Sequence, residues 1–221
     1  MIVYGDNGVD TIFYTTNGSW SAETKVLTSE GVEIATLAME GQDKATRGDS
    51  CAVKTWYHFT LVGNADGVTL AITAADGTEV LAATKVSEFA HATGFNLRLG
   101  KALSQMALDQ ITMYIGGKKV NTQLQVIDFE DKATFADGWT LGGGVTQFWN
   151  VREDGTHFMN VKENMKGDRD NTYMINNNAF LNAGEWTMQF DWAAYSSNAN
   201  NSSMIVYGDN GVDTIFYTTN G

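Results

Sequence analysis

Short stretches of alternating apolar and polar residues recur along this chain. Examples are Val68–Thr73, Gln110–Ile115 and Glu185–Asp191. Because successive side chains of a β-strand point to opposite faces, this period of two predicts strands with one buried face and one wet face. The best helix candidate, Ser87–Ala92, is short. The pattern therefore predicts an all-β fold.

Glycine-containing dipeptides typical of hairpin turns separate these stretches. Asp-Gly and Asn-Gly favour tight turns because both positions accept left-handed backbone geometry. The chain has 23 glycines and no proline, so its turns must rely on Gly and Asn. Many short strands with such turns favour a sandwich or a barrel. The predicted turns are Asn7-Gly8, Asp66-Gly67, Asp76-Gly77, Asp137-Gly138 and Asp154-Gly155.

One segment, MIVYGDNGVDTIFYTTNG, occurs twice without a substitution, at 1–18 and at 204–221. Each copy predicts one hairpin, with strands at Met1–Tyr4 and Thr11–Thr15 in the first copy. The copies are offset by 203 residues, and a period of that length indicates an array of domains. One sandwich has a place for only one such hairpin. The other copy must therefore hang free, pair at a sheet edge or enter a neighbouring molecule.

Length and charge narrow the class of protein. A chain of 221 residues can bury one sizeable core. Its net charge of −12 repels phosphate backbones and anionic lipids, so we expect neither nucleic acid nor a membrane as partner. We find no apolar run long enough to span a bilayer and no signal peptide. The lone Cys51 leaves a reducing compartment and a bacterial surface equally open.

Ordered motifs between Lys54 and Tyr114 resemble the C-terminal half of concanavalin A-like and laminin-G-like lectin domains. They are Trp56-Tyr57-His58, Asp76-Gly77, the string LRLG ending at Gly100, and LDQITMY ending at Tyr114. A second region, Val126 to Asp131 with Trp139 soon after, is similar to the first strand of these domains and of jelly-roll carbohydrate-binding modules. The resemblance implies an antiparallel two-sheet jelly-roll sandwich.

The two regions stand in the reverse of the family's order, because the last strand of the family precedes its first strand here. Joining 126–203 to 1–114 restores the order. We therefore expect 1–114 to be the C-terminal half of the sandwich, 126–221 the N-terminal half and 115–125 an interdomain linker. The chain is then one permuted domain, or it holds halves of two adjacent repeats of a tandem array.

Catalysis is not expected. Glucanases of related folds carry their catalytic carboxylates on one strand as E-x-D-x-x-E, and no such string is present. Glu185 and Asp191 could share a strand face, but they would lie about 20 Å apart, which is too far for retaining hydrolysis. His58, His91 and His157 are scattered in sequence, and we expect His58 to be structural.

Three acidic residues are candidate ligands for a structural calcium ion, which takes roughly six to eight oxygen ligands. Jelly-roll carbohydrate-binding modules often hold such an ion between the first and last strands. The resemblance places Asp109 and Glu130 at those positions, with Asp128 as a companion. The alternative is that all three are solvated acids in turns, which is the commoner role of such residues.

Sugar binding is the commonest role of this family. It needs exposed aromatic faces for the apolar side of a pyranose and polar groups for its hydroxyls. We expect Trp56, Trp139 and Trp186 to be core residues. The candidate sugar-binding residues lie in or beside polar, Asn-rich stretches and are Trp20, Trp149, Trp192, Tyr195, Asn176 and Asn198.

The sequence therefore predicts a non-catalytic, extracellular or cell-surface lectin-like module that binds a polysaccharide or glycan, or acts in adhesion. One alternative is a purely structural or filament-forming repeat that self-associates by strand exchange of the duplicated hairpin. The other alternative is a glycoside hydrolase of the same fold.

Overall fold

The computed structural model describes residues 23–38, 55–88, 98–101, 105–115, 122–142, 145–163, 173–176, 185–195, 204–207 and 214–219. Within these residues every regular element is a β-strand, and every strand pairing is antiparallel. The all-β prediction is confirmed. The strands are β1 (Glu23–Thr28), β2 (Glu33–Ala38), β3 (Tyr57–Asn64), β4 (Gly67–Ala74), β5 (Glu79–Ser87), β6 (Arg98–Lys101), β7 (Gln105–Ile115), β8 (Thr122–Ile127), β9 (Trp139–Gly142), β10 (Val145–Val151), β11 (His157–Glu163), β12 (Tyr173–Asn176), β13 (Trp186–Tyr195), β14 (Met204–Tyr207) and β15 (Thr214–Thr219).

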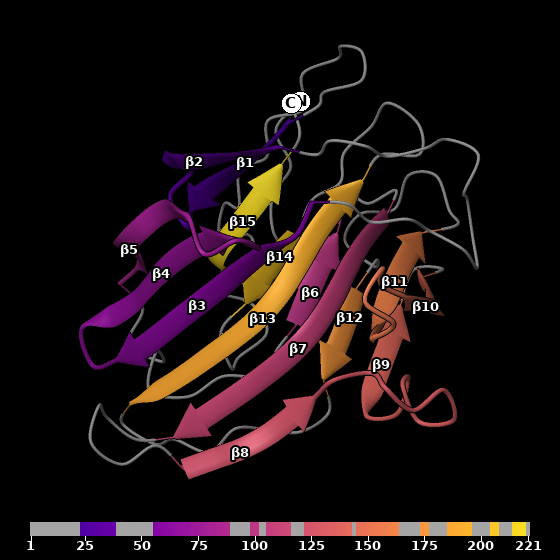
Figure 1. Ribbon diagram of the computed structural model, residues 1–221. Helices are drawn as coiled ribbons and strands as arrows, with labels where there is room; N and C mark the ends of the chain where they lie inside the picture. Colours follow the sequence, from indigo (N-terminus) through magenta and orange to yellow (C-terminus); the bar gives the residue numbers. More distant parts are fainter. Residues whose placement is uncertain are drawn as a thin grey trace.

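The strands form two sheets, one behind the other in Figure 1. The seven-stranded sheet has the order β2-β1-β15-β14-β6-β12-β9. The eight-stranded sheet has the order β10-β11-β7-β13-β3-β4-β5, with β8 paired to β7. Phe59 of β3 stacks on Phe216 of β15 with ring centroids 5.8 Å apart. These two rings come from different sheets, so the sheets pack on a shared core.

The strand alternation explains which side chains enter this core. In β3, Tyr57, Phe59 and Leu61 are buried, whereas His58 and Thr60 between them are partly exposed. A period of two thus places apolar residues on the face between the sheets and polar residues on the outer face. Burial of each large apolar side chain contributes roughly 1.5–3 kcal/mol. The Tyr57 hydroxyl accepts a hydrogen bond from the Ala38 backbone N–H at the end of β2 (2.7 Å), which ties the two sheets together.

Both sides of the segment 115–125 contribute to one core. Val26 and Leu37 precede this segment, Met188 and Phe216 follow it, and all four belong to the same buried cluster. The segment itself differs from the linker that we expected, because it holds the end of β7 and the start of β8. Those two strands pair with each other, with Ile115 opposite Thr122. Residues 116–121 lie outside the described residues.

Four of the predicted turns are present, and three of them close hairpins; the Asp137-Gly138 turn instead leads from β8 to β9, which lie in different sheets. Gly67, Gly77, Gly138 and Gly155 all have positive φ angles, between 79° and 120°. This left-handed geometry is the reason that glycine is needed at these turns. The Asn7-Gly8 turn and the first copy of the duplicated hairpin lie outside the described residues, whereas the second copy forms β14 and β15.

The short helix candidate Ser87–Ala92 is not helical where the structure describes it. Ser87 ends β5, Glu88 is not helical, and residues 89–92 lie outside the described residues. In the described part of the chain no helix is long and apolar enough to cross a membrane.

Candidate functional site

The outer face of the eight-stranded sheet carries a polar row across four neighbouring strands. Asp109 of β7 is the register partner of Asp191 of β13, and Asp191 is the partner of His58 of β3. His58 is in turn the partner of Thr73 of β4. We call these four residues the polar row. Its members come from distant parts of the sequence, and only the strand order brings them together.

A β-bulge in β7 sets the position of Asp109. The register between β13 and β7 shifts between Gln189 and Asp191, and Gln110 of β7 has a φ of 49°. The extra residue lets Leu108 and Ile111 both face the core while Asp109 faces outward. The Gln110 backbone N–H donates a hydrogen bond to the Asp109 carboxylate (2.8 Å).

Arg152 reaches over the polar row from the turn that follows β10. The turn is closed by hydrogen bonds from the Arg152 N–H to the Thr156 carbonyl (2.7 Å) and from the Gly155 N–H to the Arg152 carbonyl (3.1 Å). The Arg152 guanidinium makes ion pairs with both carboxylates, from Nε to Asp109 Oδ2 (2.7 Å) and from Nη2 to Asp191 Oδ2 (2.8 Å). Its carbon Cζ lies 3.8 Å from the ring centroid of Trp56, as a cation–π contact.

The two carboxylates of the polar row differ in their electrostatics. Burial raises the pKa of Asp109 to about 7 from the ordinary 3.8, against the opposing effects of Arg152 and the Gln110 N–H. Burial also acts on Asp191, but hydrogen bonds from His58 and Arg152 hold the pKa of Asp191 below its usual value. His58 Nδ1 lies 3.0 Å from Asp191 Oδ1. Arg152 therefore pairs with two carboxylates whose charged forms differ in stability. Hydrogen bonds stabilise the charged form of Asp191, whereas burial destabilises the charged form of Asp109.

A cavity of about 320 Å³ opens beside the polar row. Two aromatic residues, Trp56 and Tyr57, line one part of it, and His58, Arg152 and Asp191 supply polar groups. Its volume is within the range of small-molecule sites, and its fixed polar groups lie beside two largely buried aromatic residues. The remaining lining residues are Thr73, Ala74, Ala75 and Gly77.

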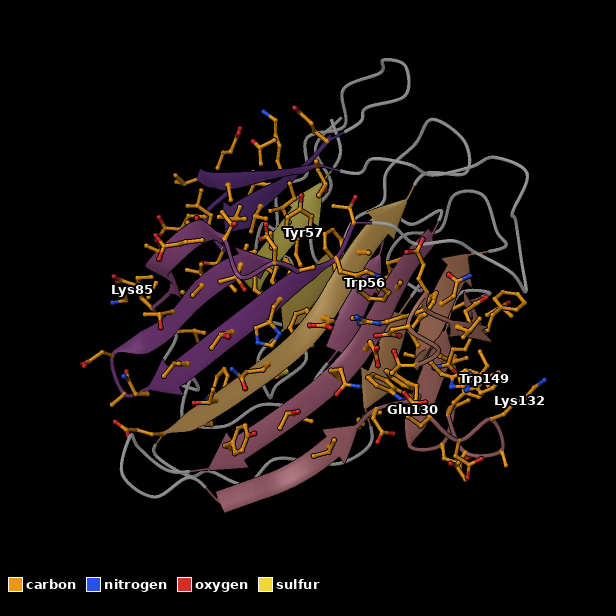
Figure 2. The ribbon with its side chains drawn as sticks, viewed as in Figure 1. Trp56, Tyr57, Lys85, Glu130, Lys132 and Trp149 are labelled. Carbon is orange, nitrogen blue, oxygen red and sulfur yellow. The ribbon has the colours of Figure 1, made fainter. Side chains whose placement is uncertain are left out.

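A second polar cluster lies around Trp149 of β10. Its indole ring stacks on His157, with centroids 3.8 Å apart and planes at 11°, and the Lys132 ammonium lies 5.4 Å from its centroid. The indole N–H donates to the Phe129 carbonyl (2.8 Å). His157 also pairs with Glu130, from Nδ1 to Oε2 (2.8 Å). Figure 2 shows Trp149, Lys132 and Glu130 grouped beside β9, while Trp56 and Tyr57 lie near the start of β3.

Of the six predicted sugar-binding residues, the structure describes the side chains of Trp149 and Trp192 only. Trp192 was expected to face a sugar, and this prediction is wrong, because the residue is fully buried and packs edge-on against Phe59 (5.6 Å). Trp149 is half-buried, and its contact with His157 leaves at most one face for a ligand. Tyr195 and Asn176 end β13 and β12, and their side chains are outside the described part. Trp20 and Asn198 lie outside the described residues altogether.

The predicted core tryptophans are confirmed. Trp56, Trp139 and Trp186 are all buried, with 8%, 9% and 4% of their surface exposed. Trp56 nevertheless lines part of the cavity, and its ring contacts the Arg152 guanidinium there.

The three predicted calcium ligands contact different partners. Asp109 pairs with Arg152, Glu130 accepts hydrogen bonds from the His157 backbone and ring, and Asp128 accepts one from the Glu130 N–H (3.2 Å). A cation beside Asp109 would also face the Arg152 guanidinium. Across the described residues, no group of three or more His, Cys, Asp or Glu side chains is arranged to hold a metal ion. These residues therefore do not fit a calcium site as they stand.

Sequence reasoning did not single out Arg152 for this candidate site, and it expected His58 to be structural. Asp191 was considered only with Glu185, along one strand. The pairing that matters runs across strands, from Asp191 to Asp109 and to His58. One signal was available in the sequence, namely a cation placed between a strand-like stretch and the Asp154-Gly155 turn. Its partners, however, depend on register, which the sequence pattern does not contain.

No protein-family model matches this chain, and no curated protein is significantly similar to it.

Proposed function

We propose that this chain is a non-catalytic lectin-like module that binds a polysaccharide or glycan at the cavity beside the polar row, at the cell surface or outside the cell. The observation that carries the proposal is the cavity itself, in which aromatic Trp56 and Tyr57 lie beside His58, Asp191 and Arg152. Trp56 and Tyr57 are 8% and 7% exposed, so the polar groups are the main contacts that the cavity offers to the hydroxyls of a sugar.

The proposed architecture is a concanavalin A-like jelly roll. Two antiparallel sheets around one core support it. A second support is the pairing of β7 with β8, in which Ile111 lies opposite Ile127. These strands match the last and first strands of the family, and such folds bring those two strands side by side.

Binding without catalysis is supported by the state of the two carboxylates. Asp109 does not line the cavity, and its side chain is 1% exposed. Asp191 lines the cavity, but it accepts hydrogen bonds from both His58 and Arg152. A general acid must exchange its proton with a bound substrate. Asp109 has no access to a bound substrate, and Asp191 is held in its charged form, so neither is placed to act as the general acid.

Affinity electrophoresis in gels that contain single polysaccharides tests the binding proposal. Ala75 is an exposed residue of the cavity wall, so Ala75→Trp should fill the cavity and abolish retardation. Ala83→Trp is the matched control, because Ala83 is an exposed residue of β5 outside the cavity. Equal retardation of the two variants, or no retardation of the original chain on any polymer, would contradict the proposal. Hydrolysis of a β-glucan would favour the glycoside hydrolase instead.

A second candidate function is a purely structural repeat, which acts as a spacer or a filament subunit. One observation favours it: the second copy of the duplicated hairpin is not appended to the fold but lies within the seven-stranded sheet, between β1 and β6. Absence of binding to every polysaccharide, together with self-association, would favour this function.

A further inference from the structure

The hairpin β14–β15 fills a defined place in the seven-stranded sheet, which we call the hairpin slot. On one side β15 pairs with β1, where Lys25 lies opposite Thr219 and Thr28 opposite Phe216. On the other side β14 pairs with β6, where Ile205 lies opposite Gly100. Without the hairpin, β1 would keep only β2 as a partner and β6 only β12. An empty slot would leave the facing backbone groups of β1 and β6 unpaired.

Phe216 anchors the hairpin in the slot. Its side chain is fully buried, and its ring stacks on Phe59 of the opposite sheet. Loss of a buried aromatic side chain of this kind leaves a cavity and strongly weakens packing. Occupancy of the slot therefore depends strongly on this residue.

A second segment of every chain carries the same recognition features. Residues 1–18 repeat 204–221 letter for letter, so Phe13 corresponds to Phe216 and Thr16 to Thr219. Identical sequences make identical contacts with a given slot, and only the chain connections differ. Eight residues, 196–203, connect the second copy to β13, and eight residues, 17–24, lie between Thr16 and Lys25. Each chain thus carries two copies of this segment for one slot.

We propose that the hairpin slot accepts this hairpin from a second copy of the chain, and that strand exchange at this slot is the self-association interface. If the chain is the structural repeat proposed above, its partner is then a second copy of itself. This proposal does not depend on the glycan site. In dilute solution a tethered hairpin is favoured, because tethering gives it an effective concentration in the millimolar range. Exchange between chains therefore grows as the protein concentration approaches that range, and as the resident hairpin is weakened.

Disulfide trapping between two full-length chains tests the proposal, with Cys51→Ser in both. The recipient carries Lys25→Cys together with Phe13→Ala and Phe216→Ala, which weaken both of its own hairpins. The donor carries Thr219→Cys in an otherwise intact hairpin. The two chains are refolded together, oxidised and separated without reductant. Because Lys25 and Thr219 are register partners, we expect a recipient–donor disulfide.

Two further donors supply the matched control, because they carry the same substitution in identical sequence surroundings. Phe216→Ala lies in the hairpin that bears the cysteine and should lower the disulfide yield at least tenfold. Phe13→Ala lies in the other copy and leaves the hairpin that bears the cysteine intact, so it should lower the yield less. Equal yields from these donors, or a yield no higher than that of a Glu79→Cys donor, would overturn the proposal.

The recipient with Phe13→Ala and Phe216→Ala could fail to fold. A second recipient, which carries Lys25→Cys but keeps both phenylalanines, tests the proposal in that case. With it, the disulfide should form only as the protein concentration rises toward millimolar, and the two donors should again differ. A yield that stays at the Glu79→Cys level across the whole concentration range would also overturn the proposal. No polysaccharide is present, so a negative result leaves the glycan proposal untouched.

Discussion

The two faces of the eight-stranded sheet carry different kinds of side chain, although the same strands supply both. Toward the other sheet, Phe59, Phe190 and Trp192 form an aromatic layer, in which Phe59 and Phe190 stack at 5.1 Å. One residue away along the same strands, His58 and Asp191 belong to the polar row on the outer face. The aromatic layer is held by non-directional burial, whereas the polar row depends on one cation, Arg152. The aromatic core therefore fixes the positions of the strands, whereas the charges of Asp109 and Asp191 are balanced by a single neighbouring residue, Arg152.

The largest expected effect comes from breaking the aromatic layer. Trp192→Ala should lower the free energy of unfolding by about 4 kcal/mol, because it leaves a large cavity in the core. Trp192→Phe should cost much less, since the buried indole N–H has no hydrogen-bond partner among the described residues. Urea denaturation measures both. Comparable losses for the two variants would contradict the placement of Trp192.

Removal of Arg152 should have the next largest effect. Arg152→Met leaves Asp109 and Asp191 without their shared cation and should cost about 3 kcal/mol near neutral pH. Lys132→Met is a matched control, because Lys132 also contacts a tryptophan ring but is exposed. We expect it to change the urea midpoint little. If the two substitutions cost the same, Arg152 does not hold the polar row together.

The ionisation of Asp109 should make the stability of the polar row depend on pH. The pKa of Asp109 is raised to about 7 in the folded chain from 3.8, mainly by burial. The stability linked to this raised pKa is fully present below pH 3.8 and is lost as the pH rises to about 7. Asp109→Asn cannot ionise. Between pH 3.8 and about pH 7, the folding equilibrium constant of Asp109→Asn relative to that of the original chain should therefore rise at least tenfold, about 1.4 kcal/mol.

Urea unfolding as a function of pH measures this difference. Arg152, Asp191 and Glu130 face Asp109 and are present in both chains, so their own titration largely cancels in the comparison. A constant difference from acidic to neutral pH would show that Asp109 is not strained by burial.

The smallest effect is expected at the second polar cluster. Hydrogen bonds from the His157 side chain and backbone lower the pKa of Glu130. The linked stability is therefore present above the unfolded pKa of 4.5 and is lost as the pH falls through the lower folded pKa. Because the Glu130 side chain is 41% exposed, solvent screens the pair. Glu130→Gln should leave the thermal midpoint at neutral pH within error, and a large shift would show that this cluster is structural.

Several features were predictable because they depend on neighbours in the sequence. Alternation gave the strands around Val68–Thr73 and Gln110–Ile115, and Asp-Gly pairs gave four of the turns. The core positions of Trp56, Trp139 and Trp186 were also predicted. Trp192 was not, since it alternates correctly in β13 but its polar surroundings in sequence suggested a surface position. Sequence neighbours on a strand face the opposite side and do not report burial.

By itself the sequence determined that the chain forms β-strands joined by glycine turns and that it carries one 18-residue segment twice. Alternation, turn chemistry and sequence identity can all be read without the tertiary structure. Only the tertiary structure decided that Asp109, Asp191 and His58 form one row under Arg152, and that the second hairpin copy lies between β1 and β6. The physical reason is that strand order and register follow from how the whole core packs. A shift of one residue would turn Asp191 inward and Trp192 outward.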